Sequence, residues 1–207
     1  MPLMRTATKQ RRPRTKPAEE RREELMIAAQ RLFLKHGVGP TTIEQITSGA
    51  DVAKGTFYLY FSSKEDVLAA LGRHFAEGLL AGIKAAIAAK PSQDWKGKLA
   101  TWAQAGMAGY LDSIHLPDVV FAGSHRPPTR EGLVDNIVID HLCGLLQAGA
   151  GAGAWAIDDA RSTAIFLFSG LHGLVDDACI IKEKRGSRNR LAQMLEKLWL
   201  RAVGLPE

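Results

Sequence analysis

The stretch TTIEQITSGADVAKGTFYLYFSSKEDVL, residues 41–68, predicts two short helices joined by a tight break. Either threonine at its start, Thr41 or Thr42, can cap the first helix, because an acid or amide side chain follows three residues later, as in a capping box. That helix covers about residues 43–48, and Gly-Ala-Asp at positions 49–51 ends it. Two short helices about three residues apart, with glycine near the turn, are typical of a helix-turn-helix.

The second helix, expected over about residues 52–60, carries four aromatic side chains within five positions when residue 61 is included. Phe57 and Phe61 are four residues apart and continue the apolar face of Val52, so we expect them in a small core. Another surface of this helix gathers groups that can donate hydrogen bonds to phosphate oxygens, namely Lys54, Thr56, Tyr58 and Tyr60. Gly55 among them allows close approach of the backbone to a partner, although a tight helix crossing would also explain it.

A long helix is expected over residues 63–89. A serine at position 62 or 63, with an acidic residue three positions later, can form the capping box at its start. Lys64 then lies in the first turn beside free backbone amides, and a helix start of this kind is an anion site. An ordinary capped helix with its lysine in solvent is the alternative.

Residues 41–68 resemble the DNA-binding region of the TetR family of bacterial transcriptional repressors, and a helix expected over residues 19–36 matches the one that this family places before it. The resemblance covers about residues 19–75. It implies a DNA-facing surface made of Thr42, Lys54, Gly55, Thr56, Tyr58, Leu59 and Tyr60. It also implies that Tyr58, Tyr60 and Lys64 hold phosphates.

Two positions depart from the pattern of that family. Asp51 stands where the family often has glycine, and aspartate can adopt a turn conformation. Leu59 stands where relatives are often polar and has no hydrogen-bonding group. We therefore expect Leu59 to meet a thymine methyl group in the major groove.

The net charge of +5 is concentrated at the N-terminal end. Residues 1–64 hold 12 Lys and Arg against 6 Asp and Glu, whereas residues 65–207 hold 15 against 16. Residues 1–17 contain six basic residues, no acidic residue and three prolines, which predicts a disordered basic arm suited to a polyphosphate. A solvated tail that only keeps the chain soluble is the alternative.

Composition favours a cytoplasmic, nucleoid-associated protein that does not enter a membrane. The two cysteines, Cys143 and Cys179, are too few for a disulfide framework and are expected to be buried and inert. No apolar run is long enough to span a bilayer.

The remaining pattern is helical, with helices expected over about residues 94–113, 129–148, 159–181 and 187–203, and with a flexible Ala-Gly connector over residues 148–155. The predicted fold is therefore all-α. A helix-turn-helix DNA-binding domain over residues 18–64 precedes a helical effector-binding and dimerisation domain over residues 65–207.

The last two helices carry more apolar residues than one chain's core requires, which favours a homodimer with an isologous interface. The resemblance implies a four-helix bundle between two copies. The interface is expected at Leu167, Leu171, Leu174, Leu191, Leu195 and Leu198. A purely internal role for these residues is the alternative.

The resemblance also implies a small hydrophobic effector bound in the helical domain. The expected lining residues are Trp102, Met107, Tyr110, Phe121, His141, Phe168 and His172, with membership of the core as the alternative for each. His172 and Asp176 are four residues apart but lack a third metal ligand, so no metal or other cofactor is expected. The serine, histidine and aspartates of residues 169–177 share one helix and cannot form a catalytic triad, so no enzyme is expected.

The sequence thus predicts a dimeric repressor that binds double-stranded DNA at a palindromic operator and is released by the effector. The alternative is a DNA-binding protein of the same fold that organises chromosomes or controls division without a ligand.

Overall fold

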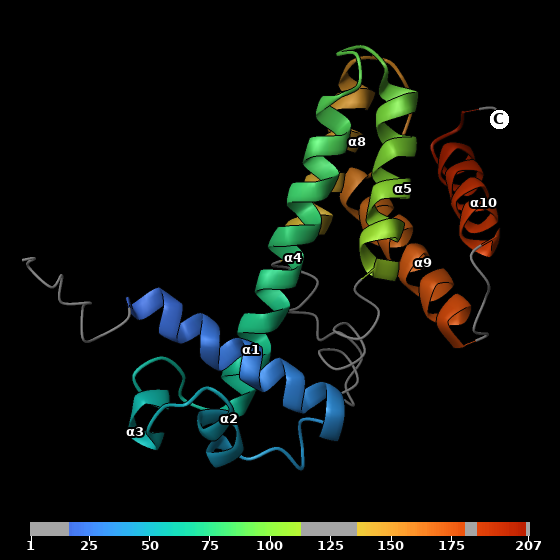
Figure 1. The fold of residues 1–207 in the computed structure, drawn as a ribbon. Helices are drawn as coiled ribbons and strands as arrows, with labels where there is room; N and C mark the ends of the chain where they lie inside the picture. The colour runs from blue at the N-terminus through green and yellow to red at the C-terminus, as the bar shows by residue number, and fades with distance from the viewer. Residues whose placement is uncertain (1–16, 113–135, 181–185, 206–207) are drawn as a thin grey trace, which may run out of the picture.

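The computed structural model of the chain describes residues 17–112, 136–180 and 186–205, and these contain helices and turns but no strand. The predicted all-α fold is confirmed. The helices are α1 (Ala18–His36), α2 (Ile43–Gly49), α3 (Lys54–Phe57), α4 (Lys64–Ala88), α5 (Trp95–Asp112), α8 (Ile137–Gly151), α9 (Ala160–Ile180) and α10 (Gly186–Ala202) (Figure 1). None of these described helices is long and apolar enough to cross a lipid bilayer. The predicted basic arm lies outside the described residues except for Pro17.

An N-terminal unit forms where α1, α2 and α3 gather around the first turns of α4 (Figure 1). Its core consists of Leu25, Met26, Ala28, Ala29, Phe33, Ile46, Phe57, Phe61, Val67, Ala70 and Leu71. Phe57 is fully buried and its ring centroid lies 5.8 Å from that of Phe61, which is also buried. The prediction that these two aromatic residues form a small core is confirmed.

Helix α4 is continuous through both units of the molecule. Ser63 caps it by accepting a hydrogen bond from the backbone N–H of Asp66, but the Asp66 carboxylate accepts from the N–H of Ser62, so the reciprocal bond of the predicted capping box is not formed. Its first turns place Val67 and Leu71 in the N-terminal core. Further along, α4 contributes Leu79, Leu80 and Ile83 to a second core. The division between the two hydrophobic cores therefore falls within α4, between Leu71 and Leu79.

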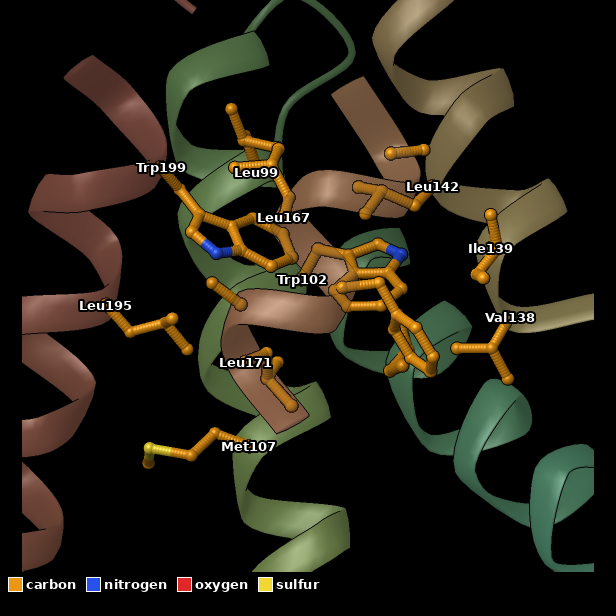
Figure 2. Packing of buried hydrophobic residues seen from close by; sticks show 14 of the residues in the cluster. Leu99, Trp102, Met107, Val138, Ile139, Leu142, Leu167, Leu171, Leu195 and Trp199 are labelled. Carbon is orange, nitrogen blue, oxygen red and sulfur yellow. The ribbon is translucent and has the colours of Figure 1, made fainter. Parts of the chain in front are cut away.

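The second core is built by α4, α5, α8, α9 and α10 (Figure 2). Helix α5 lies against α4 and α10, while α8 lies against α9 and α4. The largest fully buried side chains of this unit are Trp102, Trp199, Ile83, Leu99, Ile139, Leu142, Leu146 and Leu171. Figure 2 shows the rings of Trp102 from α5 and Trp199 from α10 beside Leu167 from α9.

The Ala-Gly segment after residue 148 is more ordered than the sequence predicts. Helix α8 continues to Gly151, and the indole N–H of Trp155 donates to the carbonyl oxygen of Leu146 at 2.9 Å. A Cβ atom on Gly149 would lie 2.0 Å from the Trp155 ring, so glycine is what lets the indole pack on this helix. The prediction of a flexible connector was wrong because it ignored the tryptophan at the end of the segment.

Candidate functional site

A capping box fixes the start of α2. The Thr42 hydroxyl accepts a hydrogen bond from the Gln45 N–H at 3.2 Å, and the Gln45 side-chain oxygen accepts one from the Thr42 N–H at 2.9 Å. Thr41 has a different role, because its buried hydroxyl donates to the carbonyl oxygen of Gly37 at 2.7 Å. Of the two possible caps, Thr42 is therefore the one used, and its side chain stays exposed.

The turn between α2 and α3 depends on Asp51. Its φ of 52° lies in the left-handed region, which aspartate enters more readily than most residues. The Val52 N–H then donates to the carbonyl oxygen of Thr47 at 3.0 Å and closes the turn. The prediction that Asp51 adopts a turn conformation is confirmed.

The second helix of the motif is shorter than predicted. It covers only Lys54–Phe57, and residues 58–60 form a turn in place of the expected helix over residues 52–60. The N–H groups of Leu59 and Tyr60 donate to carbonyl oxygens three residues back, at 3.2 and 3.0 Å, which tightens the chain after Phe57. The tightened segment still returns Phe61 to the core beside Phe57.

The outer surface of this motif, which we call the α2–α3 face, consists of the exposed residues Thr42, Lys54, Gly55, Tyr58 and Leu59 and the partly exposed Thr56. Leu59 is 78% exposed and Tyr58 is 53% exposed. Tyr60 is only partly accessible because it packs against the N-terminal core. A Cβ on Gly55 would have no atom within 4 Å, so no tight helix crossing explains this glycine and the backbone there is open to a partner.

An ion pair that the sequence did not suggest crosses the α2–α3 face. The Lys54 ammonium donates to the carboxylate of Glu44, and both side chains are more than half exposed. This hydrogen bond lowers the pKa of Glu44 and raises that of Lys54. The partners are ten positions apart, which hides the pair from local sequence patterns, and the turn at Asp51 brings them together.

The ammonium of Lys64 does not point at free helix amides. It donates to the carbonyl oxygens of Val38, Gly39 and Thr41 at 2.9, 2.6 and 3.2 Å. An ammonium has three donors, and here each has a carbonyl acceptor. A phosphate contact by Lys64 would therefore require at least one of these bonds to break.

The helical domain brings five of the predicted lining residues together. They are Trp102 and Tyr110 of α5, His141 of α8, and Phe168 and His172 of α9, called here the aromatic–histidine cluster. The Phe168 ring centroid lies 6.4 Å from that of Trp102, 6.2 Å from that of Tyr110 and 4.8 Å from that of His172. Met107 is buried in the same core, whereas Phe121 lies outside the described residues.

Two hydrogen bonds set the chemistry of the histidines in this cluster. The Trp102 indole N–H donates to His141 Nδ1 at 3.0 Å. Because an indole can only donate, Nδ1 must accept, and the proton of neutral His141 is on Nε2. The hydroxyl of Tyr110 is hydrogen-bonded to His172 Nε2.

Burial keeps these groups uncharged near neutral pH. It lowers the pKa of His172 against the opposing effect of Asp176, and it lowers the pKa of His141 together with the nearby charge of Lys84. Burial also raises the pKa of Tyr110. The cluster therefore presents neutral polar groups within an apolar surround, as sites for hydrophobic ligands commonly do.

We expect acid to destabilise the chain through these histidines. Because their pKa values are lower in the folded state than the ordinary value of 6.5, the unfolded state binds more protons below pH 6.5. The free energy of unfolding should therefore fall as the pH drops from about 7 towards 5. Thermal unfolding across this range should show a weaker pH dependence in His172→Gln. The exposed His74 provides the control, since His74→Gln should keep the pH dependence of the parent chain. Equal slopes for parent and His172→Gln would contradict the assignment.

The apolar residues of α9 and α10 are divided between the core and the surface in a way that the sequence did not predict. Leu167, Leu171 and Leu195 are 3%, 0% and 2% exposed within a single chain, so they belong to its own core. Leu174 and Leu191 pack partly against that core. The assignment of Leu167, Leu171 and Leu195 to a dimer interface is corrected, because these three side chains face the chain's own interior.

Other apolar residues of these helices remain exposed. Phe166 on α9 is 71% exposed, and Met194 and Leu198 on α10 are 41% and 46% exposed. Leu198 alone of the six predicted interface residues is among the exposed large apolar side chains.

Two short helices with a tight turn and an exposed, hydroxyl-bearing second element define a helix-turn-helix protein. A profile of the family described as "Bacterial regulatory proteins, tetR family" matches residues 25–71, which include both short helices and the start of α4. The N-terminal unit is therefore similar to the helix-turn-helix region of this family, and a helical domain follows it in the chain.

Curated relatives match over only part of the chain. The HTH-type transcriptional activator FasR of Mycolicibacterium smegmatis is 38% identical over 72 residues, which is 34% of this chain and 32% of the relative. The HTH-type transcriptional repressor KstR2 of Mycobacterium tuberculosis is 38% identical over 61 residues, which is 30% of each chain. The aligned region thus spans about a third or less of these relatives.

Solved structures match over nearly the whole chain. The fatty acid degradation regulator FadR from Bacillus halodurans has a TM-score of 0.71 and 23% identity, covering 93% of this chain and 97% of that one. A complex of SmeT with triclosan has a TM-score of 0.66 and 19% identity, covering 88% of this chain and 91% of that one. At these identities the likeness concerns the fold.

Proposed function

We propose that this chain is a dimeric transcriptional repressor that binds a palindromic operator and is released from it by a small hydrophobic effector. The observation that carries the proposal is the α2–α3 face. It presents an ammonium, three hydroxyls and an exposed leucine around an open glycine backbone. Hydrogen-bond donors of this kind suit phosphate oxygens, and a short helix of this kind suits the major groove.

The contacts on DNA follow from exposure. Thr42, Lys54, Thr56 and Tyr58 would donate to the phosphate backbone, with Tyr60 contributing its partly accessible hydroxyl. Leu59, the most exposed large apolar residue of the chain's described part, would meet a thymine methyl group. Gly55 would allow the backbone to come close to the duplex.

Dimerisation supplies the second helix-turn-helix unit. Two helix-turn-helix units must lie about 34–36 Å apart to enter successive major grooves, and a two-fold dimer matches a palindrome. The exposed face of α9 is suited to self-association, because Phe166 projects beside Gly170 and Gly173, whose missing Cβ atoms would meet no atom within 4 Å. Phe166 of one copy would pack over the two glycines of the other, flanked by Met194 and Leu198.

The aromatic–histidine cluster is the proposed effector site. Its neutral histidines can hydrogen-bond a polar group of a ligand whose body contacts Trp102, Phe168 and Met107. The triclosan complex of SmeT, a protein of the same fold, supports a small aromatic effector. A hundredfold release from DNA needs the effector to favour the released form by only about 2.7 kcal/mol.

The proposed function places the DNA-binding unit before the middle of α4 and the effector and dimerisation unit after it. Helix α4 belongs to both cores, so a change around Leu79 or Ile83 can reach the helix-turn-helix without crossing a flexible joint. The basic arm would add sequence-independent attraction to the same duplex.

DNA binding is tested with the purified full chain and a labelled duplex library. At about 50 mM salt we expect retention of duplex, with affinity that falls steeply as salt rises. Selection from the library should enrich palindromes. Hydrophobic aromatic compounds that bind the chain in a thermal-shift screen should release it from the enriched duplex. A folded chain that retains no duplex at low salt overturns the proposal. Binding at many dispersed genomic sites, with no enriched palindrome, would favour a chromosome-organising factor instead.

The same library tests Leu59. Leu59→Ala should lose preference at the base pair whose thymine methyl it contacts, by about 1 kcal/mol or roughly fivefold, while total affinity for unrelated duplex stays near that of the parent. An unchanged preference at every base pair would contradict the role of Leu59.

A further inference from the structure

The loop between α1 and α2 is fixed to the start of α4 by one side chain. Lys64, in the first turn of α4, places its ammonium within 3.2 Å of three carbonyl oxygens, those of Val38, Gly39 and Thr41. The acceptors lie 23 to 26 residues earlier in the sequence. The bonds therefore tie together two segments that are distant along the chain.

The loop that Lys64 holds leads directly to the DNA-facing start of α2. The chain leaves α1 at Gly37, whose φ of 81° reverses its direction. It then passes the buried Thr41 and reaches the cap residue Thr42. The last of the three carbonyls belongs to Thr41, so the ammonium is bonded to the residue adjoining this cap.

We propose that Lys64 is a positioning residue that acts on DNA binding through the α1–α2 loop, and that its ammonium does not contact phosphate. The inference rests on the proposed DNA-binding function. A single nitrogen with three hydrogens satisfies three carbonyls that converge on one point. The geometry sets Thr42 in place before DNA arrives, so removing the ammonium loosens the loop.

The salt dependence of binding separates this role from a phosphate contact. Each phosphate neutralised by a side chain contributes about 0.9 to the slope of log affinity against log salt concentration. Lys64→Met keeps the length of the side chain and removes the ammonium. We expect about tenfold weaker binding to the selected duplex with an unchanged slope. Lys54→Met is the matched control, and it should lower the slope of log affinity against log salt concentration by about 0.9 for each helix-turn-helix unit.

Lys64→Arg gives a second, independent comparison. It keeps the positive charge, but a planar guanidinium cannot bring three hydrogens of one nitrogen to three converging carbonyls. The arginine variant should therefore bind as weakly as the methionine variant. The proposal is overturned if Lys64→Arg binds with the affinity of the parent chain. It is also overturned if Lys64→Met lowers the salt slope by about 0.9 for each helix-turn-helix unit.

Two measurements without DNA keep the inference separate from the proposed function. In the parent chain, acetic anhydride should label Lys64 at least tenfold more slowly than the exposed Lys90. In Lys64→Met, the amide hydrogen of Thr42, held by Gln45 in the parent, should exchange about tenfold faster, while the core amide of Phe57 should not change. Equal labelling of Lys64 and Lys90, or unchanged exchange at Thr42, would refute the positioning role of Lys64 even if the chain binds DNA. Absence of DNA binding with Lys64 protected would refute only the proposed function.

Discussion

Phe166→Glu is expected to convert the chain to a monomer and to weaken its binding to a palindromic duplex by about 10²–10⁴-fold. Phe166 is 71% exposed on α9, and a carboxylate there would have to lose its hydration if the face were covered by a second copy. A dimer gains because the second head binds at high effective concentration once the first is bound, and a monomer has no such gain. The fold of each chain should persist, since the side chain is not part of the core.

Sedimentation and duplex binding measure the two consequences on the same samples. Ile137→Glu is the matched control, because Ile137 is also a large exposed apolar residue, 39% exposed, but lies on α8. It should leave both the mass and the affinity unchanged. A dimeric Phe166→Glu chain, or an Ile137→Glu chain that is monomeric as well, would contradict the placement of the interface on α9 and α10.

Local sequence patterns predicted the parts of the helix-turn-helix that depend on neighbouring residues. The capping box at Thr42 and the turn at Asp51 involve residues no more than five positions apart, so neighbouring residue types were enough to predict both. The four-residue spacing of Phe57 and Phe61 likewise predicted their burial. The extent of α3 was overestimated because helical spacing alone does not register the tighter hydrogen bonds at Leu59 and Tyr60.

Contacts between distant segments were not accessible in this way. The pairing of Lys54 with Glu44 and the bonds from Lys64 to Val38 both depend on how the chain turns between the partners. A lysine in a first helical turn looks the same in sequence whether it meets phosphate, water or a carbonyl oxygen. Only the folded position of the α1–α2 loop distinguishes these cases.

The apolar stripes of α9 and α10 illustrate a different limit. Periodicity identifies which residues share a face, but it does not say whether that face meets the chain's own interior or a second chain. Leu171 proved to be internal, whereas Phe166, off the main stripe, is exposed. The surplus of apolar residues was the informative signal, and the part of it that remains exposed consists of Phe166 on α9 and of Met194 and Leu198 on α10.

Trp102→Ala should have the largest effect on stability, lowering the free energy of unfolding of the helical domain by about 3–5 kcal/mol. Trp102 is fully buried, and its ring centroid lies 5.3 Å from that of Trp199 (Figure 2). Alanine would leave a cavity between α5, α9 and α10, and it would deprive His141 of its hydrogen-bond donor. A loss of this size is a large share of the 5–15 kcal/mol that typically separates folded and unfolded domains.

The conservative pair Trp102→Phe and Trp95→Phe separates the hydrogen bond from the loss of volume. The indole N–H of Trp95 is buried and has no hydrogen-bond partner, so phenylalanine there removes no bond. Chemical denaturation should therefore show a greater loss for Trp102→Phe than for Trp95→Phe, by about 1 kcal/mol or more. The N-terminal core contains neither tryptophan, so amide exchange at Phe33 and Ile46 should report whether its stability is independent of the damaged domain. A Trp102→Ala chain within about 1 kcal/mol of the parent would mean that this ring is not the centre of the second core.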